Sequence, residues 1–231
     1  MRGTKATAQP LICMNQRALP AILALMMACV FPALAGETPA GTNGVARGNP
    51  LLEYKFANEL GEPTSIADFR GKVVAVTFFF TRCPMPQFCP RLSKNFQEAS
   101  RILRGSGSAF TNWHFLSITF DPEFDTPAVL RAYGERYDYN PAEWSFLTGP
   151  KDKIAALASL AGIKTDPDSG LINHNFRTLI LDARGRLRMV FPMGGNLTDP
   201  IVEEMRKAAL APEVAKNAAQ QKSNLTSPPA R

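Results

Sequence analysis

The side chains best suited to chemistry in this sequence are those of two cysteines and one histidine. Five residues separate Cys83 from Cys89, and His174 follows much later in the chain. Paired thiols can exchange disulfides, and two thiolates with one imidazole form a soft, low-coordinate ligand set that suits Cu(I). We therefore expect a copper site or a redox-active pair, while a permanent disulfide that staples the loop is the structural alternative.

Cys89 is predicted to lie at the amino terminus of a helix. Pro90 is suited to the first turn of a helix, and residues 91–103 carry apolar side chains at helical spacing. The positive end of the helix dipole, together with Arg82 and Arg91, is expected to favour the thiolate form of Cys89. The pattern therefore predicts a reactive or metal-binding sulfur at this position.

Cys83 follows a continuous apolar run at residues 72–80, which is typical of a strand covered on both faces in a parallel sheet. This run is predicted to be the central strand, with Phe78, Phe79 and Phe80 in the core. Open α/β sheets bind ligands at the carboxyl ends of their strands, so Cys83 is expected at the functional edge. The prolines between the two cysteines stiffen the loop that joins them.

The other elements are predicted to alternate between strands and helices. Strands are expected at residues 113–120, 176–181 and 187–191, helices at 126–137, 151–161 and 199–210, and a short strand near Tyr54. Thr126 is expected to cap its helix, and residues 182–185 are expected to form a hairpin turn. This order predicts an α/β fold over residues 51–210, with a central, mostly parallel sheet flanked by helices and a C-terminal antiparallel hairpin.

Four other side chains could serve the site. His114, beside Trp113 at the start of a strand, is predicted to be a packing or edge residue, because nothing else reactive is near it in the sequence. Met85 could offer a thioether to copper, although an exposed loop side chain without this role is the favoured interpretation. Asp121 and Asp125 could support the site or a partner surface, but could equally shape a turn and start the next helix.

The first 35 residues have the pattern of an export signal. A basic start ends at Arg17, an apolar run covers residues 18–34, and an Ala-Leu-Ala sequence precedes Gly36. A membrane anchor is the second interpretation, and the sequence around Cys29 is only weakly similar to a lipoprotein cleavage site. We expect residues 1–35 to be a signal peptide or membrane anchor, which places the protein in the periplasm or cell envelope, with inner-membrane anchoring as the alternative.

Removal of the leader also changes the charge and the cysteine content. The formal net charge of the chain is +6, but without the three basic residues of the leader 23 basic and 20 acidic residues remain, so no nucleic-acid partner is predicted. Cys13 and Cys29 belong to the leader, which leaves one cysteine pair. Residues 36–50 are predicted to be a flexible linker and residues 211–231 a disordered tail.

Three separated motifs resemble those of the SCO/SenC family in order and spacing. They are Phe80-Thr-Arg-Cys83 with Cys89-Pro90, the segment from Ser117 to Pro127, and His174 before the segment 179–185. SCO/SenC proteins are thioredoxin-fold copper chaperones for the binuclear copper site of cytochrome c oxidase. The resemblance covers residues 51–210 and implies a thioredoxin-like fold, with one copper ion held by Cys83, Cys89 and His174 and an oxidised cysteine pair as the metal-free redox state.

The resemblance implies a chaperone that delivers copper to an acceptor such as a respiratory oxidase subunit, with a thiol reductant protein as another partner. The family motif usually has three residues between its cysteines, whereas this chain has five, so copper affinity and redox potential cannot be transferred from the family. The alternative function is that of a thiol-disulfide oxidoreductase or thiol peroxidase of the cell envelope, in which one cysteine attacks and the other resolves.

Overall fold

The structure is a computed structural model, and it describes residues 49–107, 110–166, 173–175, 177–192 and 195–210. The predicted leader, the predicted linker up to residue 48 and the predicted tail at 211–231 lie outside these residues. Among the helices of the described ranges, none has the length and apolar character needed to cross a bilayer.

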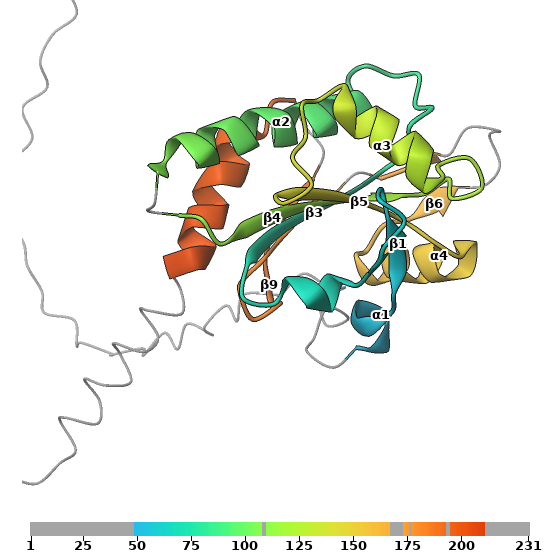
Figure 1. The fold of residues 1–231 in the computed structure, drawn as a ribbon, viewed down its shortest axis with the longest axis horizontal. Helices are drawn as coiled ribbons and strands as arrows, with labels where there is room; N and C mark the ends of the chain where they lie inside the picture. The colour runs from blue at the N-terminus through green and yellow to red at the C-terminus, as the bar shows by residue number, and fades with distance from the viewer. Residues whose placement is uncertain (1–48, 108–109, 167–172, 176, 193–194, 211–231) are drawn as a thin grey trace, which may run out of the picture. The chain divides into compact units, whose positions relative to one another are not determined.

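A seven-stranded sheet forms the centre of the fold (Figure 1). Its strands lie in the order β2-β1-β5-β4-β3-β8-β9. Their bounds are Phe56–Asn58 (β1), Pro63–Thr64 (β2), Val73–Phe79 (β3), Trp113–Thr119 (β4), Trp144–Thr148 (β5), Arg177–Leu181 (β8) and Leu187–Pro192 (β9). The three central strands β5, β4 and β3 are parallel, whereas both flanks pair in the antiparallel sense. The predicted C-terminal hairpin is confirmed, but the parallel part of the sheet is smaller than expected.

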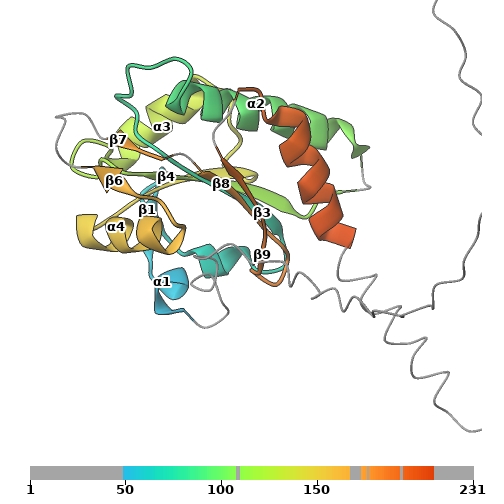
Figure 2. The ribbon, with the colours of Figure 1, turned by 180° about the vertical axis from the view of Figure 1, so that it is seen from behind.

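Helices cover both faces of the sheet (Figures 1 and 2). One face carries α2 (Cys89–Gly105), α3 (Pro127–Glu135) and a helix over residues 198–210, and the other carries α1 (Pro50–Glu53), the 3-10 helix η2 (Ile66–Phe69) and α4 (Lys151–Leu160). Because successive side chains of a strand point to opposite faces, β3 contributes to both cores. Val73, Ala75 and Phe79 pack with α2 and α3, and Val74, Val76 and Phe78 pack on the other side. This arrangement confirms the predicted α/β fold and the central place of this strand.

The local signals for helix and turn ends are confirmed. The Thr126 side chain accepts a hydrogen bond from the Val129 backbone N–H at 3.4 Å, so α3 begins where the cap was predicted. In the turn between β8 and β9, Asp182 Oδ1 accepts the backbone N–H of Arg184 at 2.9 Å, and Gly185 has a φ of 73° that favours glycine.

The sequence analysis missed β5, although every residue of this strand is buried. Its five residues include Ser145 and Thr148, and so short a mixed run has no period that separates it from a loop. Neighbours distant in sequence stabilise it, because β4 pairs with it on one side and β1 on the other. The buried carboxylate of Glu59 also accepts the Phe146 backbone N–H, at 2.9 Å.

Candidate metal centre

The two cysteines lie at the ends of the loop that joins β3 to α2. The Cys83 backbone N–H donates to the Phe80 carbonyl at 3.3 Å, so a turn follows β3 at once, and the Phe88 N–H donates to the Met85 carbonyl at 3.0 Å. Cys89 is the first residue of α2, as predicted. The two turns bend the chain back, so that the end of the central strand and the start of the helix meet.

The cysteines are neighbours with unequal exposure. Neither is in a disulfide; Cys83 is half-buried, whereas Cys89 is 0% exposed. Both pack against the same hydrophobic cluster, and the Cys83 thiol lies close enough to Cys89 to raise the pKa of its thiol. The Cys83 sulfur also donates to the Met85 carbonyl, at 3.9 Å. The loop of five residues therefore brings the two sulfurs together, with one accessible from solvent and the other enclosed.

Burial raises the pKa of the Cys89 thiol well above its ordinary value, and the adjacent Cys83 thiol raises it further, against a lowering hydrogen bond with the Phe80 backbone. The expectation that Cys89 favours the thiolate is therefore wrong for the reduced, metal-free protein. The helix dipole stabilises the thiolate form of Cys89, but burial removes the hydration of that anion. The loss of hydration destabilises the thiolate more than one helix terminus stabilises it.

The predicted effect of Arg82, stabilisation of the Cys89 thiolate by its charge, is not what the structure favours, because Arg82 is engaged with other groups. Its Nε donates to Asp121 Oδ2 at 3.0 Å, and its guanidinium lies 4.2 Å from the centre of the Phe124 ring. The charge of Arg82 is thus paired with a carboxylate and stacked on an aromatic face. Contacts with residues that are remote in the sequence therefore decide where the Arg82 side chain lies.

The enclosed side of Cys89 is lined by aromatic and hydroxyl groups. Ser93 lies one helical turn after Cys89, so the two side chains are neighbours on α2. The Ser93 hydroxyl is 2.9 Å from the hydroxyl of Tyr133, and burial raises the pKa of this phenol well above its ordinary value. Among the side chains that the structure describes, Cys89 thus packs with uncharged groups, which include Ser93 and the aromatic residues of the hydrophobic cluster.

The backbone at His174 lies at the same edge of the sheet as the cysteine loop. In the antiparallel pairing of β3 with β8, Thr77 faces Thr178, so β8 begins beside the carboxyl end of β3. His174 precedes the first residue of β8, Arg177, by three positions. The register therefore carries the chain at His174 toward the end of β3 that leads into Cys83.

A small separate ladder fixes this part of the backbone. β6 (Thr165–Asp166) pairs with β7 (Asn173–His174), with Thr165 opposite His174. The Asn175 side chain accepts the Lys164 backbone N–H at 2.6 Å and donates to the Gly162 carbonyl at 3.3 Å. Both views show β6 and β7 on the side of the sheet toward which the loop before α2 extends (Figures 1 and 2).

Only the backbone of His174 belongs to the described part of the chain, so the structure tests its place but not its imidazole. Among the side chains that the structure does describe, no group of three or more His, Cys, Asp or Glu is arranged to hold a metal ion. The pair of adjacent thiols fits a soft metal in the chemistry of its donors. The third ligand, His174, stays a prediction.

Asp121 and Asp125 both contact the chain just before Cys83, and both also shape the turn that leads into α3. The Asp125 N–H donates to the Asp121 carbonyl at 2.8 Å, while the Asp125 carboxylate accepts the backbone N–H of Thr81 at 3.1 Å. The interpretation that these residues shape the turn is therefore confirmed, whereas a role in supporting the site or a partner surface stays a prediction. The sequence analysis did not single out Thr81 or Thr119, which also bonds to Asp125; the available signal was a polar residue at the end of each buried strand.

His114 is a packing residue, as predicted. It is buried in β4, inside the sheet and not at its edge, with its Nε2 3.0 Å from Ser145 Oγ and its ring centre 4.2 Å from that of Phe69. Burial, with a smaller effect of the Lys72 charge, lowers the pKa of His114 from 6.5 to about 3.

We expect acid to destabilise the protein through His114. In the unfolded chain His114 takes up a proton as the pH falls through 6.5, but in the folded protein it stays neutral until about pH 3. The contribution of neutral His114 to the free energy of unfolding is therefore complete above pH 6.5 and decreases as the pH falls below it. By about pH 4.5 the loss is about 3 kcal/mol, which urea unfolding at a series of pH values measures. The variant His114→Gln should lack this part of the slope; equal slopes in both proteins would contradict the assignment.

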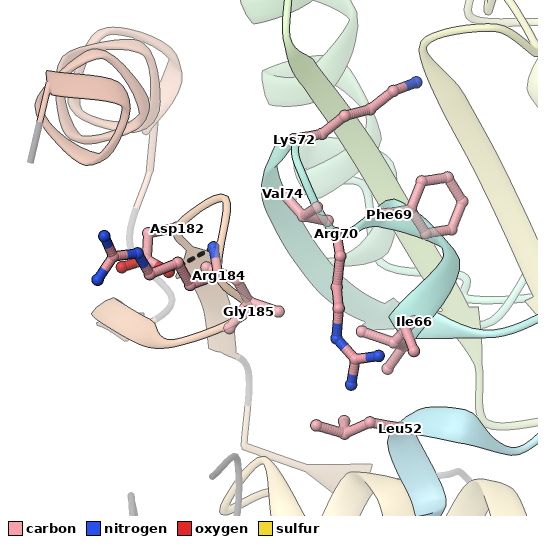
Figure 3. A pocket seen from close by; sticks show the side chains of 11 residues that line it. Leu52, Ile66, Phe69, Arg70, Lys72, Val74, Asp182, Arg184 and Gly185 are labelled. Atoms are coloured by element: carbon pink, nitrogen blue, oxygen red, sulfur yellow. Dashed lines mark hydrogen bonds between the residues drawn. The ribbon is translucent and has the colours of Figure 1, made fainter. Parts of the chain in front are cut away.

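The pocket of Figure 3 lies away from the cysteines, at the opposite end of β3. Arg70 extends toward Leu52 and Ile66, whereas Lys72 and Arg184 extend in other directions. Arg70 also binds Glu53, at 2.5 Å. The cations of this pocket do not converge, so the cysteine loop is the better candidate for function. On that loop Met85 is 40% exposed, in agreement with the plainer interpretation of its side chain.

Comparison with known proteins matches the chain to one family. A family model described as SCO1/SenC covers residues 47–210. The SCO1 protein homolog of Bacillus subtilis is 27% identical over 96 residues, which are 42% of this chain and 47% of that protein. The chain thus matches about half the length of this relative.

Solved structures of the same family share the fold. Copper-bound ScoI of Arabidopsis thaliana superimposes with a TM-score of 0.57 at 21% identity, over 67% of this chain and 96% of that one. BsSco, a member of the Sco family of cytochrome c oxidase assembly proteins in which a disulfide switch was identified, gives a TM-score of 0.58 at 23% identity, over 67% of this chain and 90% of that one. At these identities the likeness establishes the thioredoxin-like fold.

Proposed function

Because the chain belongs to the SCO1/SenC family, we propose that it binds one copper ion through Cys83, Cys89 and His174 and delivers it to a respiratory oxidase subunit. Copper-bound structures of family members support the cargo, and the assembly role given for BsSco supports the destination. The observation that carries the proposal is the pair of adjacent reduced thiols at the carboxyl end of β3. The first 35 residues would export the chain to the cell envelope or anchor it there.

The unequal exposure of the thiols suits uptake and release. Copper binding would remove the proton of Cys89, which burial otherwise retains, so binding should tighten as the pH rises. Cys83 is partly exposed whereas Cys89 is buried, so a thiolate or imidazole of an acceptor would displace Cys83 first, while Cys89 still holds the ion. A thiol reductant protein would keep both cysteines reduced between deliveries.

A thiol-disulfide oxidoreductase of the cell envelope is the second candidate, and the same asymmetry favours it. The Cys83 sulfur would attack a substrate disulfide and release one substrate thiol, after which the Cys89 thiolate would displace the second. The chain would end with a disulfide and the substrate with two thiols. In the thiol peroxidase variant, the attacked bond is the O–O bond of a peroxide.

Replacing His174 by Ala separates these two functions. The copper proposal expects the affinity for Cu(I) to fall at least about 100-fold, because even indirect partners of ligands are worth 10–100-fold. Disulfide exchange with glutathione should change less than about twofold, because it needs only the thiols. Competition with a chromogenic Cu(I) chelator measures the first quantity and mass spectrometry the second.

The matched control is His114→Gln, which removes the buried histidine of β4 and should leave Cu(I) affinity unchanged at neutral pH. Equal affinity of the His174→Ala and unsubstituted proteins would contradict the ligand set. Loss of disulfide exchange in His174→Ala would count against the separation of the two functions.

A further inference from the structure

The fully buried carboxylate of Asp125 ties the chain before Cys83 to the neighbouring strand. It accepts the backbone N–H of Thr81 at 3.1 Å, and it also accepts the hydroxyl groups of Thr81 and Thr119. Thr81 lies just after β3 and Thr119 ends β4. We propose that Asp125 is a positioning residue that sets the place of Cys83 relative to Cys89.

The composition of this cluster explains why a carboxylate stands there. Burial of a carboxylate is costly unless its oxygens are well bonded. Here three donors point at one group, and an ionised carboxyl is the side chain that accepts without donating. The Thr119 hydroxyl, in turn, accepts the Asp121 backbone N–H at 2.9 Å, so its donor and acceptor capacities are both used. Each hydrogen bond thus fixes the direction of the next.

Asp125 acts on Cys83 through a short stretch of backbone, because Thr81 precedes Cys83 by two positions. The Cys83 N–H closes a turn onto the Phe80 carbonyl, and Thr81 lies inside that turn. At the other end of the loop, Cys89 is held by the first turn of α2. Three prolines in and just after the loop restrict its backbone. Because the loop itself has little freedom, the position of Cys83 depends chiefly on where the turn at Thr81 is anchored.

Asp121 lies with Asp125 between β4 and α3, and it is a weaker anchor, although its carboxylate also accepts a hydrogen bond from Arg82, just before Cys83. Its partner is the side chain of Arg82, which is 55% exposed although the Asp121 side chain is only 11% exposed, and an ion pair that is open to solvent on one side contributes less than a fully buried one. Asp125 instead binds a backbone N–H in full burial. The two aspartates, four residues apart, therefore offer a matched comparison.

The test measures Cu(I) affinity and the equilibrium of the cysteine pair with glutathione in three variants. Asp125→Ala should bind Cu(I) about 10–100-fold more weakly, since loss of a group that orients a ligand has effects of this size. Its disulfide should also form less favourably, because a loosened loop lowers the effective concentration of one thiol at the other. Asp125→Asn should stay within about threefold of the unsubstituted protein, as should Asp121→Asn.

The rescue by Asn follows from hydrogen bonding. Its amide oxygen can accept from the Thr81 N–H and the Thr119 hydroxyl, and its NH2 can donate to the Thr81 hydroxyl, which rotates to accept. The inference is overturned if folded Asp125→Ala matches the unsubstituted protein in both measurements. It is also overturned if Asn is as damaging as Ala, because charge and not position would then be the cause.

A replacement variant and the independence of the two measurements allow a result in every case. If Asp125→Ala does not fold, Thr81→Val replaces it; this variant loses one hydroxyl but keeps the backbone donor, and should lose at least about threefold in Cu(I) affinity. The copper readout rests on the proposed function, whereas the glutathione equilibrium does not. If the unsubstituted protein does not bind Cu(I), the proposed function is wrong, but the positioning role of Asp125 is not thereby decided. The glutathione equilibrium of the variants then decides that role.

Discussion

Replacing Cys89 by Ser lowers the affinity for Cu(I) at least about 100-fold in the proposed account, more than the loss of an outer hydrogen bond would. Ser fits the space of the buried thiol, so the fold is retained, but its hydroxyl is neither soft nor ionised at neutral pH. Anaerobic titration with Cu(I), followed by thiolate-to-metal absorption, measures the effect. The unsubstituted protein should saturate near one copper ion per chain.

The control for this substitution is Ser100→Ala, another buried position of α2, which lies three turns further along the helix. Cu(I) binding should be unchanged in this variant. Saturation of Cys89→Ser at one copper ion with unchanged affinity would show that the enclosed sulfur is not a ligand.

The second large effect concerns the chemical reactivity of the two thiols. In the native reduced protein, iodoacetamide at neutral pH should modify Cys83, while Cys89 reacts at least about 100-fold more slowly, because each unit by which a thiol pKa rises lowers the thiolate tenfold. Burial both raises the pKa of Cys89 and blocks access to it. Peptide mapping by mass spectrometry distinguishes the two sites.

Unfolding in guanidinium chloride should remove this difference, since the protection of Cys89 comes from the fold. Addition of Cu(I) to the native protein should also protect Cys83. Faster modification of Cys89 than of Cys83 in the native protein would contradict the assigned exposure and would reverse the order of attack in the oxidoreductase alternative.

Patterns within a single element predicted much of the fold. The apolar run before Cys83 became β3, the proline after Cys89 began α2, and Thr126 capped α3, because each signal depends on neighbours in the chain. Only β5 among the strands of the central parallel group was missed. Its five residues are stabilised by pairing with β4 and β1 and not by a pattern of their own.

The chemistry of the site was less accessible to sequence reasoning. The residue types and the convergence of the two cysteines were predicted, but the protonation of Cys89 depends on burial by residues of several elements. Similarly, Arg82 lies 39 positions before Asp121, and Thr81 lies 44 positions before Asp125. In the sequence Arg82 is next to Cys83, and its carboxylate partner Asp121 comes close only because β3 and β4 pair side by side in the sheet.

The most direct test of the ligand set is X-ray absorption at the copper edge of the reduced protein loaded with one equivalent of Cu(I). Two sulfur neighbours and one nitrogen neighbour are expected around copper, with the nitrogen lost in His174→Ala and one sulfur lost in Cys89→Ser. A spectrum with sulfur neighbours alone, unchanged when His174 is replaced, would contradict the claim that Cys83, Cys89 and His174 hold one copper ion together.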